Sequence, residues 1–128
     1  MSKGIMWLSS YPKSGNTWFR LLLSHVLNNS TSLHYIRDVN TILGSPMVVN
    51  RSWISQVLGF DSSLLTDDEI DQIRPTLYKW YAQRLERTAY IKIHDAYTYL
   101  KNKTAIIPAE GCSGAIYFIR NPLDVAIS

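Results

Sequence analysis

Residues 5–18 read IMWLSSYPKSGNTW, an apolar segment of strand length that passes through a short polar turn into an amphipathic helix. Backbone N–H groups in the first turn of a helix lack intrahelical partners and carry the positive end of the helix dipole, so they attract anions. Lys13 adds a full positive charge, and Gly15 allows the backbone to approach a ligand closely. The hydroxyls of Ser14 and Thr17 can donate hydrogen bonds. The segment therefore predicts a turn that binds phosphate or sulfate.

Helical patterns dominate the region that follows this turn. From Thr17 to Asn28 the apolar side chains recur every four residues, which predicts an amphipathic helix. Residues 29–49 are polar, and within them a short helix is expected around Tyr35–Leu43. Asn50–Leu58 is expected to form another helix, which ends at Gly59.

A capping box marks the next helix. Thr66 is followed three residues later by Glu69, a spacing that predicts a helix N-terminus. Pro75 has no backbone N–H to donate, so we expect it to interrupt this helix and to begin a second helical piece that runs to about Arg87.

Two further strands and a helix complete the predicted order. Apolar residues alternate from Tyr90 to His94, and Ala115–Ile119 is continuously apolar or aromatic, so both segments predict strands. Asn121 followed by Pro122 predicts the cap and the first residue of a helix. This order is typical of an α/β domain with a parallel sheet flanked by helices.

Basic side chains occur at the carboxyl ends of all three predicted strands. Lys13 follows the first strand, Lys92 and His94 close the second, and Arg120 follows the third. Ligands of parallel sheets bind at this edge. We therefore expect these four residues to belong to one site.

The composition predicts one globular domain over residues 1–128. Of the 128 residues, 46% are hydrophobic and 12% are aromatic, which is sufficient for one core. The formal net charge of +3 is dispersed along the chain and favours a small polyanionic ligand over nucleic acid. Cys112 lies alone in a turn-like segment and fits a reducing cytoplasm. The most apolar stretch is too short to span a bilayer, so we expect a cytoplasmic protein with no membrane partner.

Two motifs together resemble those of a known enzyme family. Tyr11–Trp18 (YPKSGNTW) is similar to the 5′-phosphosulfate loop of sulfotransferases that use 3′-phosphoadenosine 5′-phosphosulfate (PAPS), and Tyr117–Ser128 (YFIRNPLDVAIS) is similar to their 3′-phosphate motif. The motifs occur in the family's order, with Lys92-Ile93-His94 between them. The resemblance extends over essentially the whole chain and is weakest from residue 29 to residue 65. It implies the P-loop-like sulfotransferase fold and transfer of a sulfuryl group to a hydroxyl acceptor.

The resemblance also implies a role for each matching residue. Lys13 would contact the transferring sulfuryl group, and Arg120 and Ser128 would hold the 3′-phosphate. His94 matches the family's catalytic base, and Lys92 matches the neighbouring lysine of the Lys-x-His pattern. The residues implied to surround the 5′-phosphosulfate and the adenine are Lys13, Ser14, Gly15, Asn16, Thr17 and Trp18.

The chemistry of sulfuryl transfer explains why these residue types are needed. The attacking and leaving oxygens lie in line, and catalysis depends on positioning and on stabilisation of shifting charge, as in phosphoryl transfer. Because imidazole titrates near neutral pH, a histidine can accept the proton of the acceptor hydroxyl. A lysine can neutralise the charge on the departing phosphate, and no metal ion is expected.

The chain departs from the family's pattern in two places. Asn16 stands where the family has Thr or Ser, and its short polar side chain is expected to preserve the turn. Family members run to about twice this length, in domain-size terms, and a later Gly-rich segment that contains a lysine closes over the nucleotide. The sequence ends at Ser128, before such a segment, so we expect an N-terminal portion of the domain. An incomplete domain exposes apolar surface, which favours a homo-oligomer.

Two alternative functions stay open. One is a nucleoside triphosphate site, but Lys13 precedes Gly15 rather than following the second glycine of a P-loop, and the third strand ends in Arg120 rather than in a magnesium-binding Asp. The other is a non-catalytic nucleotide-binding or assembly module, which keeps the anion-binding turn but does not complete the site.

Three further residues near the predicted site have more than one interpretation. Asp95 is a candidate metal ligand or a partner that orients His94, but we favour a solvated loop carboxylate. Tyr97 and Tyr99 follow the predicted base closely in the chain, and we expect them to line a pocket for the acceptor.

Overall fold

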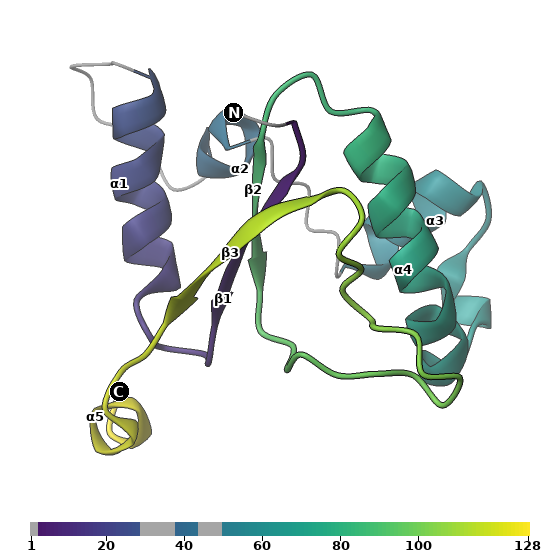
Figure 1. The fold of residues 1–128 in the computed structure, drawn as a ribbon. Coiled ribbons are helices and arrows are strands. Elements are labelled where there is room, and N and C mark those ends of the chain that lie inside the picture. The colour runs from purple at the N-terminus through teal and green to yellow at the C-terminus, as the bar shows by residue number, and fades with distance from the viewer. Residues whose placement is uncertain (1–2, 29–37, 44–49) are drawn as a thin grey trace.

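The computed structural model describes residues 3–28, 38–43 and 50–128, and its centre is a three-stranded parallel sheet in the order β2-β1-β3 (Figure 1). The strands span Ile5–Ser10 (β1), Ala89–Ile93 (β2) and Cys112–Phe118 (β3). All three predicted strands are therefore confirmed, as is the α/β class with helices flanking a parallel sheet. Cys112 is the exception in detail, because it begins β3 rather than lying in a turn.

Helices lie on both sides of this sheet (Figure 1). Their bounds are Asn16–Asn28 (α1), Val39–Ile42 (α2), Arg51–Leu58 (α3), Asp67–Gln83 (α4) and Pro122–Ala126 (α5), with a short 3₁₀ turn at Ser62–Leu64. The short helix expected around residues 35–43 lies partly outside the described residues, and its described part contains α2. Within the described part of the chain, none of the helices is both long enough and apolar enough to cross a membrane.

The main core lies between the sheet and α4. Alternation along β1 and β2 directs Ile5, Trp7, Ile91 and Ile93 to this side, and all four are at most 2% exposed. Tyr78 of α4 packs edge-on against Trp7, with 5.0 Å between the ring centroids. This contact packs α4 directly against the central strand β1.

Local capping sets the limits of α3 and α4. The Asn50 side chain accepts a hydrogen bond at the start of α3, and Gly59 ends that helix with a φ of 77°. The Thr66 hydroxyl accepts from the Glu69 backbone N–H at 3.3 Å, while the Glu69 carboxylate accepts from the Thr66 N–H at 2.8 Å. Both predicted helix starts are confirmed.

The predicted interruption at Pro75 is wrong. α4 continues from Asp67 to Gln83 with Pro75 inside it, and it ends before Arg87. A proline in a helix interior removes one backbone hydrogen bond. Here, however, Pro75 is buried together with Leu77 and Tyr78. Tertiary packing of this face therefore keeps the helix in one piece, as is common for helices in folded domains.

Residues 94–111 connect β2 to β3 by passing along the α4 side of the sheet (Figure 1). Tyr99 and Ala105 form an isolated antiparallel bridge within this connection. At its end, the carbonyl of Gly111 accepts a hydrogen bond of 2.8 Å from the N–H of Ile5, which leads the chain into β3. The connection thus covers the same sheet face as α4.

Candidate functional site

The turn between β1 and α1 contains two residues in the left-handed backbone region. Lys13 has a φ of 67° and Gly15 has a φ of 95°. Turns of this kind bring successive backbone N–H groups together in concave, anion-binding arrangements. A Cβ atom at Gly15 would meet no heavy atom within 4 Å, so the space beside this backbone is open to a ligand. The predicted turn is present, and the Lys13 side chain is exposed at its surface.

Asn16, the first residue of α1, turns its side chain into the protein. It is 4% exposed, and its Nδ2 donates to the Leu8 carbonyl at 2.7 Å and to the Ser10 Oγ at 3.1 Å. These bonds tie the start of the helix to the end of β1, across the turn. A contact between Asn16 and an anion would therefore have to come from the backbone N–H.

Arg120 reaches the same turn from the end of β3. Its Nη1 donates a hydrogen bond of 2.9 Å to the carbonyl of Lys13, 107 residues away in the chain. A guanidinium carries five N–H donors, so this bond leaves others for a ligand. The structure therefore brings together the two basic residues that the sequence placed at the ends of β1 and β3.

His94 lies directly after the last residue of β2. Its Nδ1 is 2.6 Å from the carbonyl oxygen of Ser10 and 3.4 Å from the Ser10 Oγ. A carbonyl oxygen only accepts, so this contact requires a proton on Nδ1, and in the neutral imidazole the lone pair then lies on Nε2. The imidazole is thus held against the end of β1, and its Nε2 forms no hydrogen bond with the residues that the structure describes.

The other predicted residues lie around this edge with different degrees of exposure. Lys92 pairs with Leu8 in the sheet and lies on the strand face opposite that of Ile91 and Ile93. Thr17 is exposed, and Trp18 is 71% exposed, which leaves its ring available for stacking. The backbone N–H of Ser128 donates to the carbonyl of Val125 at 3.3 Å.

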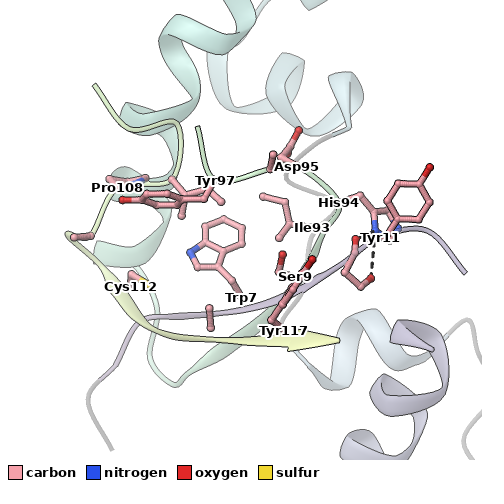
Figure 2. Close-up of a pocket in the computed structure, with 15 residues that line it drawn as sticks. Trp7, Ser9, Tyr11, Ile93, His94, Asp95, Tyr97, Pro108, Cys112 and Tyr117 are labelled. Atoms are coloured by element: carbon pink, nitrogen blue, oxygen red, sulfur yellow. Dashed lines mark hydrogen bonds between the residues drawn. The ribbon is translucent and has the colours of Figure 1, made fainter. Parts of the chain in front are cut away.

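A cavity of about 690 Å³ lies over the α4 side of the sheet at the strand ends (Figure 2). Figure 2 shows His94 at one end of this cavity, Cys112 at the other, and the Trp7 indole between them. Most of its lining is aromatic or apolar. Tyr97 lines it, and Tyr99 packs edge-on against Tyr97 with the ring centroids 5.6 Å apart.

A second cavity, of about 320 Å³, lies between the β1–α1 turn and α5. Ser14 and Arg120 contribute to its walls, together with apolar residues of α5. Tyr11 and Tyr117 line both cavities, so the two adjoin at these rings. The β1–α1 turn and the histidine therefore face neighbouring spaces.

Arg74 holds the segment that follows His94, and sequence reasoning missed it because nothing marks it apart from the other charged residues of the predicted helix. Its guanidinium is buried in α4 and forms ion pairs with Asp95 and with Asp71, the latter at 3.0 Å. Its Nε donates to the hydroxyl of Tyr78 at 2.8 Å. Asp95 is therefore no solvated loop carboxylate: it fastens the segment after His94 to α4.

Burial and ion pairing act in opposite directions on this cluster. Burial disfavours the charge of Arg74, but the hydrogen bonds with Asp95, Tyr78 and Asp71 outweigh it and raise the pKa of the guanidinium. Burial also raises the pKa of Tyr78, against the opposing effect of Arg74. Arg74 therefore remains charged over the whole range of physiological pH.

Comparison with known proteins found no relative of this chain: no family model, no curated protein and no solved structure matches it. What the fold and the site themselves define is an α/β domain whose parallel strands present lysine, arginine and histidine residues at one edge. The chemistry carried out at this edge has to be argued from those residues.

Proposed function

We propose that this chain binds PAPS at the strand ends and transfers its sulfuryl group to a hydroxyl acceptor. The observation that supports this most directly is the hydrogen bond between Arg120 and the Lys13 carbonyl. The two motifs that resemble the 5′-phosphosulfate loop and the 3′-phosphate motif thus meet at one place. A ligand with anionic groups at two positions is the kind that such a pair of sites would hold.

The residues present fit such a co-substrate. The open turn around Gly15 offers backbone N–H groups at the N-terminus of a 13-residue helix, which suits the 5′ group. Arg120 retains further donors for the 3′-phosphate, and Ser128 would add a hydroxyl. Trp18, which is exposed in the first turn of α1, would stack on the adenine.

His94 would act as the general base. With the proton on Nδ1, its Nε2 is the atom that would accept the proton of the acceptor hydroxyl. The acceptor oxygen would then form a bond to sulfur as the bond between sulfur and the 5′-phosphate oxygen breaks. Lys13 would stabilise the negative charge that grows on the departing phosphate, and Lys92 would assist from β2.

The cavity beside His94 would receive the acceptor. Its walls are mainly apolar and aromatic, which favours an uncharged acceptor whose hydroxyl points toward the imidazole. Tyr11 and Tyr117 separate this cavity from the one at the anion-binding turn. This arrangement would place the two substrates on either side of the transferring group, as in-line displacement requires.

Binding and transfer are tested separately. Calorimetric titration with 3′,5′-adenosine bisphosphate should show one site, and Arg120→Met should weaken it by about 10- to 100-fold because it removes a charge-assisted contact. Arg84→Met removes an exposed arginine that lies over Trp80, away from the site, and should leave the affinity unchanged. If both variants bind as the native chain does, Arg120 is not a nucleotide ligand.

Transfer is then measured with labelled PAPS and a panel of alcohols and phenols. We expect label in the acceptor with the native chain and none with His94→Ala. Bisphosphate binding without transfer to any acceptor would favour the alternative, a nucleotide-binding module without catalytic activity.

A further inference from the structure

A buried amide connects the anion-binding turn to the candidate base. Asn16 uses both hydrogens of its Nδ2, one toward the Leu8 carbonyl and one toward the Ser10 Oγ. The residue is 4% exposed, and both bonds are to β1. The start of α1 is therefore fixed to the last residues of the central strand.

Ser10 passes this constraint to the imidazole. It is 2% exposed and is the last residue of β1. Its carbonyl accepts a hydrogen bond from the His94 Nδ1 at 2.6 Å, and its Oγ, which already accepts from Asn16, lies 3.4 Å from the same nitrogen. The orientation of one serine thus determines where two neighbouring groups point.

The hydrogen bonds of Asn16 require a side chain that donates, because both of its partners accept. Its Oδ1 is buried and has no hydrogen-bond partner among the described residues. An unpaired buried acceptor is unfavourable, so the position keeps an amide for its two N–H donors. A carboxylate of the same shape would turn an acceptor toward the Leu8 carbonyl and would repel it.

We propose that Asn16 is a positioning residue that, through Ser10, holds His94 as the Nδ1–H tautomer with Nε2 available as a base. The part that this plays in sulfuryl transfer rests on the proposed function. The tautomer itself is a property of the folded chain and is present without substrates.

The test reads the tautomer by nuclear magnetic resonance. In ¹⁵N-labelled protein, kept alkaline enough that imidazoles are neutral, the His94 ring should show a protonated Nδ1 and an unprotonated Nε2. Loss of these signals in His94→Gln assigns them. In Asn16→Ala, both nitrogens should move toward the averaged values of a histidine that exchanges between tautomers.

Two further variants keep the result interpretable. Asn50→Ala makes the same chemical change at the N-terminus of α3, where the side chain caps a helix far from His94, and should leave the His94 signals unchanged. Asn16→Leu keeps much of the side-chain volume and removes the donors without burying a charge, so it should reproduce the loss of the tautomer even where Asn16→Ala, which leaves a cavity, does not fold.

Kinetics separates positioning from binding. With PAPS and an acceptor, the Asn16 variants should lower kcat by about 10- to 100-fold because the base is misplaced, while KM for PAPS changes little. A protonated Nε2 in the native chain overturns the proposal, as does an unchanged tautomer in both Asn16 variants. Absence of transfer by a native chain with the expected tautomer would instead reject the proposed function and leave the tautomer assignment standing.

Discussion

Replacing Arg74 by methionine tests how the segment after His94 is held in place. Methionine retains much of the apolar stem of arginine and removes the charge and the donors. The buried hydroxyl of Tyr78 loses its partner, at a cost of about 1–2 kcal/mol in the free energy of unfolding. Asp95 loses its ion pair, but 32% of its side chain is exposed, so hydration limits this loss to about 1–2 kcal/mol. We therefore expect a total loss of about 2–4 kcal/mol.

Urea denaturation followed by tryptophan fluorescence measures this loss. The midpoint should fall while the slope stays the same, because the change affects the native state and not the surface exposed on unfolding. Domains of this size are stable by about 5–15 kcal/mol, so the variant should still fold. Arg84→Met is the matched control, because this exposed arginine lies over the Trp80 ring and should cost less than about 0.5 kcal/mol.

Nuclear magnetic resonance of Arg74→Met tests whether the segment of residues 94–97 is still held in place. Loss of the anchor for Asp95 should broaden the resonances of residues 94–97 more than those of α1. A loss of stability below about 1 kcal/mol for Arg74→Met would show that the buried network does not hold this segment, and the argument for its supporting role would fail.

Three further predictions concern a glycine, a helix cap and the site. Gly111→Ala should destabilise the fold more than Gly59→Ala does, by about 1–3 kcal/mol in urea denaturation. Both glycines have φ near 80°, but a Cβ at Gly111 would lie 2.5 Å from a side chain of α4, whereas a Cβ at Gly59 would meet open space. Equal losses of stability in the two variants would contradict this. The hydrogen bonds of the helix cap lower the pKa of Glu69, so the stabilisation by this carboxylate is fully present above the ordinary pKa of a glutamate and is lost as pH falls through the lowered pKa. Glu69→Gln should therefore reduce the dependence of unfolding free energy on pH in this acidic range. Parallel stability curves for the two proteins would refute this. In the transfer assay, His94→Ala should abolish turnover while retaining bisphosphate binding, whereas Arg120→Ala should chiefly weaken binding; equal activity in the histidine variant would remove that residue from the mechanism.

Local sequence was sufficient wherever a feature depends on neighbouring residues. The caps at Thr66 and Asn121 were predicted, because a cap involves residues two or three positions apart. The three strands were predicted from short apolar runs, and their basic ends from the residues that follow. Pro75 is the instructive failure, since its local preference is to end a helix and only the burial of its face overrides that preference.

Contacts between distant segments were decided by the tertiary structure alone. The ion pair between Arg74 and Asp95 joins residues 21 positions apart, and the bond between Ser10 and His94 joins residues 84 positions apart. Neither pair has a periodicity or a spacing that a sequence pattern can reveal, because each depends on how α4 and the strands stack.

The sequence by itself determined which side chains stand at the strand ends: Lys13, His94 and Arg120 follow apolar segments of strand length. The parallel sheet and its shared carboxyl edge were also predicted, from the order of the elements. Only the tertiary structure decided that the strand order is β2-β1-β3, with β1 in the centre. It also decided that Asn16 points inward while Arg120 reaches the turn. The physical reason is that hydrophobic burial selects which segments form the core, whereas the direction of a polar side chain depends on donors and acceptors that the folded chain brings within hydrogen-bonding distance.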